Sequence, residues 1–259
     1  MQMNTSPTSL SRLMMAGTLL LTMGLATNAS AGGIALGATR VIYPQGDKQV
    51  SLPVINSSAD NTFLIQSWVA NVEGIKSPDF ILTPPLFVIH PKKENTLRIM
   101  YIGPDLPADR ETVFYLNSKA IPSVDKNKLQ GNTLQIATQS VIKLFIRPKK
   151  LTSLSVDAPK TLTCRTENGK VIITNPSPYY VSLVQFFVGG ARLPNSMVAP
   201  KNTLTVDIPG GGSAEGKAGV LVYEAQTNRD MAQIADRLAA RSETGLLAGC
   251  AGFASVLPR

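Results

Sequence analysis

Residues 134–150 read LQIATQSVIKLFIRPKK. Every second position from Leu134 to Leu144 falls on one largely apolar face, while Lys143 falls on the other, and this period of two is typical of a β-strand. At about 3.3 Å per residue, a strand over 132–146 is longer than a sandwich usually holds, so part of it is expected to overhang or to form an open edge. The pattern alone leaves an ordinary long core strand as an equal alternative.

The same alternation extends upstream of this strand to about residue 32. Prolines and other turn residues separate short segments that are expected to be strands, at 39–43, 49–56, 63–72, 87–90, 95–101 and 113–120. No helix of ordinary length fits among them. Several short strands with regular turn signals indicate a β-sandwich.

Downstream, the basic hinge at 147–150 is followed by a second set of short strands, expected at 162–166, 170–175, 180–188, 196–198, 203–208 and 218–224. The repetition predicts an all-β protein of two sandwich domains, 32–150 and 151–259. The end of the chain differs, because an amphipathic helix is expected over 228–241. Its apolar positions follow helical spacing, at Met231, Ile234, Ala235 and Leu238.

The bulk composition suits a folded protein with a basic surface. The chain has 259 residues, a formal net charge of +8 and a pI of about 9.6. Such a charge suits an anionic partner, either nucleic acid, an acidic membrane or a protein that presents a carboxylate. Nucleic acid is disfavoured because the sequence has no long basic run and no aromatic RNA-binding cluster.

The N-terminus has the features of a cleaved secretory signal. Arg12 precedes an apolar run over 13–26, and Ala29-Ser30-Ala31 follows, so the mature protein is expected to begin near Gly32 and to be exported. The run is shorter than a membrane span, and no second long apolar stretch follows, so no stable membrane insertion is expected. Cys164 and Cys250 both lie in the exported part, where disulfides persist, and one bridge between them is the simplest interpretation.

Two features of the sequence bear on a possible enzymatic activity. The segment GGSAEGKA at 211–218 matches a phosphate-binding loop except at its last position, where Ala218 has no hydroxyl for Mg²⁺ and a strand-like run follows instead of a helix. His90 is the sole histidine, and no cysteine or carboxylate cluster lies at ligand spacing nearby. A glycine-rich connection and a strand-end residue explain these features better, so neither an enzymatic activity, a metal nor a cofactor is expected.

Seven segments closely resemble the PapD-like periplasmic pilus chaperones. They are GATRVIYP (37–44), QSWV (66–69), TPPLF (83–87), DRETVFYLN (109–117), LQIA (134–137), IKLFIRP (142–148) and NPSPYYV (175–181). The resemblance implies two immunoglobulin-like domains set at an angle, with a pilus or fimbrial subunit held in and beside the cleft. The loop over 122–131 is short, which resembles the subgroup that serves adhesive pili.

The resemblance also implies roles for individual residues. Arg40 and Lys143 resemble the pair of cations that anchors the C-terminal carboxylate of the subunit. Leu134, Ile136 and Thr138 resemble the alternating side chains that the chaperone donates into a subunit lacking its last strand, which is donor-strand complementation. Thr138 departs from the bulky aliphatic residue usual there. The complex would then be delivered to an outer-membrane usher.

Glu111 and Arg147 resemble two members of the interdomain ionic network of this family. The third member belongs to a segment that this sequence lacks, and Glu224 is the nearest acidic candidate. From about Gly211 onward the resemblance fades, which leaves the end of the second domain open. The alternative interpretation of the whole chain is an exported fimbrial subunit or adhesin, which would also be rich in β-strand.

Overall fold

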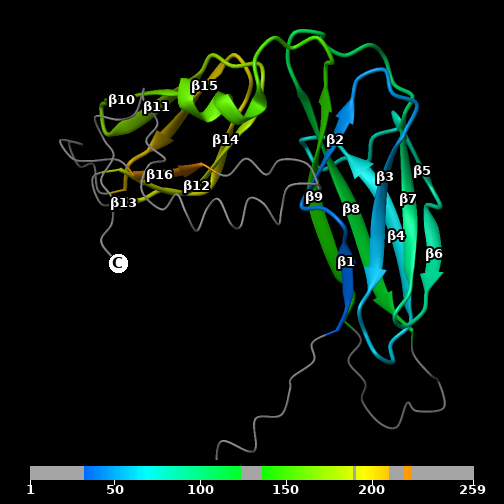
Figure 1. Cartoon of the computed structure of the whole chain (residues 1–259). Helices are drawn as coiled ribbons and strands as arrows, with labels where there is room; N and C mark the ends of the chain where they lie inside the picture. Colours follow the sequence, from blue (N-terminus) through cyan, green and yellow to red (C-terminus); the bar gives the residue numbers. More distant parts are fainter. Residues whose placement is uncertain (1–31, 124–135, 189–190, 210–218, 223–259) are drawn as a thin grey trace, which may run out of the picture.

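The computed structural model describes residues 32–123, 136–188, 191–209 and 219–222. Nine of the described strands form the first domain. They are β1 (Ile34–Leu36), β2 (Arg40–Pro44), β3 (Val50–Asn56), β4 (Phe63–Ala70), β5 (Phe80–Thr83), β6 (Leu86–Ile89), β7 (Glu94–Tyr101), β8 (Thr112–Pro122) and β9 (Thr138–Arg147). One sheet has the order β1-β3-β7-β5, and the other has the order β2-β9-β8-β4-β6 (Figure 1).

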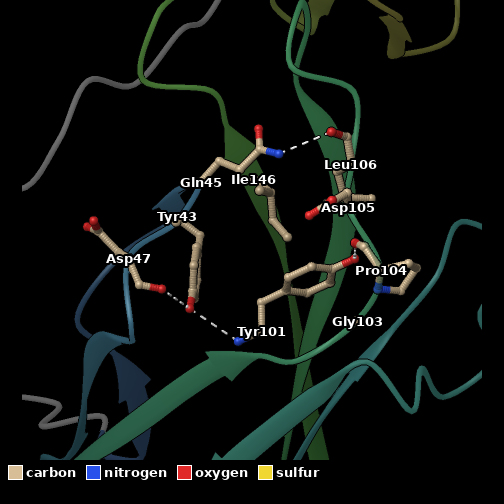
Figure 2. A pocket seen from close by; sticks show the side chains of 10 residues that line it. Tyr43, Gln45, Asp47, Tyr101, Gly103, Pro104, Asp105, Leu106 and Ile146 are labelled. Carbon is tan, nitrogen blue, oxygen red and sulfur yellow. Dashed lines mark hydrogen bonds between the residues drawn. The ribbon is translucent and has the colours of Figure 1, made fainter.

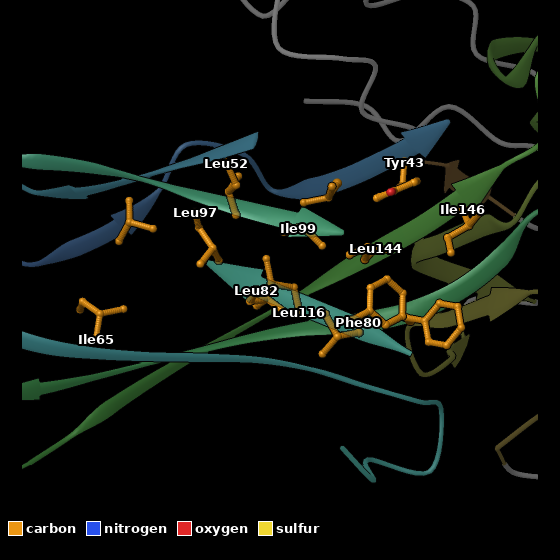
Figure 3. Close-up of a cluster of buried hydrophobic side chains, with 14 of the residues drawn as sticks. Tyr43, Leu52, Ile65, Phe80, Leu82, Leu97, Ile99, Leu116, Leu144 and Ile146 are labelled. Carbon is orange, nitrogen blue, oxygen red and sulfur yellow. The ribbon is translucent and has the colours of Figure 1, made fainter. Parts of the chain in front are cut away.

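The core of the first domain fills the space between these two sheets. Leu52, Leu97 and Ile99 come from β3 and β7 of one sheet. Ile65, Leu116 and Leu144 come from β4, β8 and β9 of the other sheet. All six side chains are at most 2% exposed (Figure 3). Alternate residues of each strand therefore point inward, as period-two patterning requires of a sandwich.

The second domain follows with a short 3-10 helix, η2 (Ser155–Thr161), and smaller sheets. One sheet consists of β10 (Thr163–Glu167), β11 (Lys170–Asn175) and β15 (Asn202–Asp207). In the other, β12 (Val181–Val188) pairs with β13 (Ala191–Arg192), β14 (Ser196–Val198) and β16 (Gly219–Val222). Its separate core includes Leu162, Ile173 and Leu183. Figure 1 shows the two sandwiches lying at an angle to each other.

The hairpin between β10 and β11 shows how the sequence sets one register. Glu167 pairs with Lys170, so the turn consists of Asn168 and Gly169 alone. Both have positive φ, 50° and 71°, as a two-residue turn of the primed type requires. Asparagine and glycine tolerate this left-handed conformation best, which fixes the alternation of β10 and β11 relative to their core.

The prediction of two all-β sandwiches is confirmed, with two differences in detail. β1, β5 and β13 were missed; strands of two to four residues carry little alternation, although β6, β14 and β16, which are of similar length, were predicted. The strand expected over 132–146 begins at Thr138, and Ile136 and Ala137 lie outside any strand. The ladder with β8 stops at Ala120 opposite Thr138, two residues before Pro122, which has no amide hydrogen to donate. The helix expected over 228–241 lies outside the described residues.

In each domain, a buried asparagine at the end of a strand holds neighbouring loops together. Asn56, the last residue of β3, donates its amide to the carbonyls of Asn61, Ile89 and His90. Asn175, the last residue of β11, donates to the carbonyls of Tyr179, Val198 and Ala199. Both are at most 1% exposed. Buried carbonyls need such partners, so these asparagines are expected to be structural residues.

Replacing Asn175 by Ala is therefore expected to destabilise the protein by about 1–3 kcal/mol, because buried carbonyls lose their donor. The matched control is Asn202→Ala, since Asn202 lies directly opposite Asn175 in the ladder but is exposed. That change should fall within about 0.5 kcal/mol of the unmodified protein. Urea denaturation measures both, and equal effects of the two variants would contradict the assignment.

Candidate binding site

The candidate site is built around two cations on adjacent strands. β2 pairs with β9 in parallel, and its first residue, Arg40, is in register with Lys143. Partners in a parallel ladder point to the same side of the sheet, so the two side chains lie next to each other. Lys143 is partly buried, and burial together with the nearby charge of Arg40 lowers the pKa of its ammonium. The structure thus brings together the two residues that the resemblance selected as a carboxylate anchor.

Lys143 also reaches the second domain. Its Nζ donates to Oγ of Ser182 in β12 at 2.7 Å. Ser182 is a buried polar residue, 8% exposed. Sequence reasoning missed it, because the matching segment NPSPYYV ends at Val181 and a single serine in a strand carries no signal of its own.

β9 has an open edge immediately before this cation pair. In the described part of the chain, Thr138 to Ile142 pair only with β8, because β2 begins opposite Lys143. The edge therefore presents backbone amide and carbonyl groups that no described strand uses. Thr138 is exposed, and Ile136, which precedes the strand, is 65% exposed. Leu134 lies outside the described residues.

Glu111 joins the two domains from the first residue before β8. Its Oε1 accepts from Nε of Arg147 at 2.7 Å, and its Oε2 accepts from the backbone N–H of Tyr180 at 2.9 Å. Its own N–H donates to the carbonyl of Pro178 at 2.9 Å. The side chain is almost fully buried, and burial raises the pKa of its carboxyl, although Arg147 and the Tyr180 amide offset part of that effect. Glu224, the expected third member, lies outside the described residues.

The pH dependence of Glu111 has the opposite sign to that of an ordinary paired carboxylate. Because its pKa is raised in the folded state, its contribution to stability is present below the unfolded value of about 4.5 and is lost as the pH rises through the folded pKa. We expect the free energy of unfolding of the unmodified protein to fall relative to that of Glu111→Gln between pH 4.5 and neutral pH. Urea denaturation of both proteins across this range measures the difference, and an increase would show that the pairing with Arg147 outweighs burial.

Other contacts across the domain boundary were not predicted. Nζ of Lys201 lies 2.7 Å from Oδ2 of Asp109, and Arg110 pairs with the same carboxylate, so both cations hold the pKa of Asp109 well below its ordinary range. The rings of Phe145 and Tyr180 lie 5.6 Å apart. Contacts between residues so distant in sequence leave no periodic signal, although Asp109 lies within the matching segment DRETVFYLN.

Arg147 makes further contacts at the start of the second domain. Its guanidinium lies 5.0 Å from the centre of the Tyr179 ring, and Nη1 donates to Oγ of Ser155 at 3.3 Å. Together with the Glu111 pair, these contacts hold one side chain of β9 against η2 and the loop between β11 and β12 of the second domain. Arg147 is therefore a structural residue of the interdomain joint.

The remaining sequence candidates do not form a site in the described structure. His90 is exposed at the turn after β6, and the described residues contain no cluster of three metal-ligating side chains. The glycine-rich segment 211–218 lies outside the described residues, as does Cys250. Cys164, in β10, is disulfide-bonded and is not a free thiol, while its predicted pairing with Cys250 stays a prediction.

A cavity of about 200 Å³ lies between the turn that follows β2 and the loop that follows β7 (Figure 2). Tyr43 Oη donates to the carbonyl of Asp47, Gln45 Nε2 to that of Leu106, and Tyr101 Oη to that of Pro104. Burial and two nearby carboxylates raise the pKa of the Tyr101 phenol. The Gln45 contact joins the two loops, and the N–H of Tyr101 donates to Tyr43 Oη at 3.2 Å, so the cavity is explained as part of the scaffold.

Two β-sandwiches joined by an ionic contact, with a pair of cations and an open strand edge at the junction, define a class of protein that binds another polypeptide. The pili and flagellar-assembly chaperone PapD N-terminal domain matches residues 33–152, and the C-terminal domain of the pili assembly chaperone PapD matches residues 157–225. The chain belongs to the PapD family of pili assembly chaperones, which is a non-enzymatic class.

The relatives agree in sequence and in structure. The chain is 51% identical over 183 residues to the probable fimbrial chaperone SfmC of Escherichia coli K12, covering 70% of this chain and 80% of the relative. It is 46% identical over 197 residues to the chaperone protein FimC of the same strain, covering 76% and 82%. The crystal structure of the periplasmic chaperone SfaE is similar, with a TM-score of 0.60, 45% identity and coverage of 69% and 89%.

A complex provides a further likeness. The SafA pilin of Salmonella enterica in complex with the SafB chaperone matches with a TM-score of 0.63 and 30% identity, covering 70% of this chain and 86% of that one. In the described residues of the present protein, no helix is both long and apolar enough to cross a membrane.

Proposed function

We propose that this protein is a periplasmic chaperone that binds a pilus subunit at the open edge of β9 and anchors the subunit's C-terminal carboxylate between Arg40 and Lys143. The observation that carries the proposal is the position of the cation pair, which lies where the open edge ends. A strand added along Thr138 to Ile142 would then run directly up to two positive charges. Its C-terminal carboxylate is the group that two fixed cations bind best.

The added strand would come from a subunit that lacks the last strand of its own sandwich. The open edge of β9 supplies ladder hydrogen bonds to that strand, and the alternating side chains at Leu134, Ile136 and Thr138 fill the apolar groove of the subunit. Because Thr138 is smaller and more polar than an aliphatic residue, a subunit with a shallow third pocket suits this chaperone best. The SafA–SafB complex supports a pilin as the class of partner.

Further elements of the proposal follow from the family. The chaperone delivers its subunit to an outer-membrane usher, acts without a cofactor, catalyses no reaction and binds no nucleic acid. The net charge of the full chain, +8, favours association with an anionic carboxylate terminus. The alternative of a fimbrial subunit is disfavoured. Such a subunit lacks the last strand of its sandwich, whereas here β9 belongs to the sheet of the first domain.

The direct test is co-purification from a periplasmic extract. The full chain, expressed together with candidate pilus subunits of its own organism, should be recovered with a second, smaller polypeptide in equal amount. Recovery of the chain alone, from cells in which the subunits are present and stable, would contradict the proposal.

The export step is tested on the same sample. We expect the mature chain to begin at or near Gly32, because Ala29-Ser30-Ala31 ends the signal-like segment. N-terminal sequencing and intact mass measure this together with the state of Cys164. A chain that still carries Met1 would show that the segment is retained.

A further inference from the structure

We propose that Ser182 is a positioning residue, which holds the ammonium of Lys143 across the domain boundary so that it is ready to bind a terminal carboxylate. The proposal rests on the anchor role of Lys143 given above. It adds a residue that the first domain does not supply. The carboxylate anchor is completed by a residue of the second domain.

The contact is direct and short. Lys143 Nζ lies 2.7 Å from Ser182 Oγ, and the serine is buried, so this acceptor has little access to competing water. A lysine side chain is a flexible chain with three rotatable donors. Donation of one hydrogen to Ser182 leaves two for a ligand and restricts where the ammonium lies. Such restriction favours binding, because less conformational freedom is lost when the ligand arrives.

The position of Ser182 depends in turn on the interdomain joint. Tyr180, two residues earlier in the chain, donates its N–H to Glu111, and its ring lies against Phe145 of β9. Glu111 and Phe145 belong to the first domain. The start of β12 is therefore fixed to the first domain just beyond Lys143 in β9, at Phe145 and at Glu111, which pairs with Arg147. A change in the angle between the domains would move Ser182 away from the ammonium, so the angle controls the anchor.

The electrostatics give a measurement that a merely structural serine would not affect. Burial and Arg40 already lower the pKa of the Lys143 ammonium. A hydroxyl oxygen that accepts a hydrogen bond favours the charged form of the amine. Removing that oxygen in Ser182→Ala should lower the pKa of Lys143 further, whereas Ser182→Thr keeps the hydroxyl and should preserve the pKa. Side-chain NMR of the lysine ammonium, compared across pH, measures this.

Binding is tested with two forms of one probe. The probe is a short peptide of alternating Val and Thr residues, prepared with a free C-terminal carboxylate and with a C-terminal amide. For the full-length mature protein we expect the acid to bind about tenfold or more tightly than the amide, a difference of about 1.4 kcal/mol or more. Ser182→Ala should reduce this ratio by a factor of about three or more, and Ser182→Thr should restore it. Lys143→Met should abolish it.

The outcomes separate this inference from the function on which it rests. If the acid and the amide bind the unmodified protein equally, the anchor itself is absent and both proposals fail. If the ratio is large and requires Lys143 but is the same in Ser182→Ala, only the role of Ser182 fails. An unchanged pKa of Lys143 in Ser182→Ala would overturn it as well. Because this variant removes a single oxygen atom, its melting temperature should stay close to that of the unmodified protein, which serves as the control for folding.

Discussion

Replacing Lys143 by Ala is expected to abolish recovery of the subunit while the free protein remains folded. Loss of one partner of a desolvated charge-assisted contact costs on the order of 2–5 kcal/mol, which lowers affinity by a few decades. The stability of the fold should not decrease, because burial lowers the pKa of this lysine, which means that its charged form is disfavoured in the folded state. Arg40→Ala is expected to behave in the same way.

The matched control for this experiment is Lys149→Ala. It removes the same charge close to the domain boundary, but Lys149 is exposed and pairs with Asp47, on the turn after β2. Exposed ion pairs contribute little, so subunit recovery should be unchanged. Co-purification and thermal melting of the variants measure the two effects separately. Normal recovery with Lys143→Ala would remove this residue from the site, and a loss with Lys149→Ala would point to net charge as the cause.

Replacing both Leu134 and Ile136 by Glu is expected to eliminate the complex and leave the melting temperature of the free protein nearly unchanged. Full burial of an aliphatic side chain is worth about 1.5–3 kcal/mol, and a carboxylate in an apolar groove adds a further penalty. Ile136 is 65% exposed in the free protein, so it contributes little to the protein's own core. The expected loss therefore lies in the complex alone.

Val88→Glu is the matched control, because Val88 is also an exposed aliphatic residue of this sheet, 54% exposed, but it lies on β6, at the edge opposite to β2 and β9. If donated side chains fill the groove of the subunit, this substitution should affect the recovery of subunits much less than the double variant. A large drop in melting temperature for the double variant would mean that these side chains belong to the core. Normal melting with normal recovery would place the binding surface elsewhere.

The fold could largely be predicted because its strands alternate over six or more residues. β3, β7 and β11 begin and end within one residue of the predicted limits, and β14 coincides with its prediction. β5 was missed because it has only four residues and is followed by Pro84. Nothing in the sequence of β7 indicates that it pairs with β5 as well as with β3. Short strands are stabilised by their neighbours in the sheet, and that information lies elsewhere in the chain.

The site was only partly predictable for a related reason. Arg40 and Lys143 were selected by family resemblance, and their parallel register places the two side chains next to each other. Ser182 lies 39 residues from Lys143 in sequence, and its contact depends on the angle between two domains. Neither periodicity nor spacing carries information about that angle. The structure is needed to show that the anchor lysine has a partner in the second domain.

The parallel pairing of β2 with β9 bears on the order in which the protein matures. These strands lie roughly a hundred residues apart, so the first strand of the sheet stays without its partner until nearly the whole domain has been made, and such distant pairings form slowly. Arg40 and Lys143 meet only when this last pairing closes. A chain that has not finished folding would therefore lack the proposed anchor, and it would not compete with mature molecules for subunits newly arrived in the same compartment.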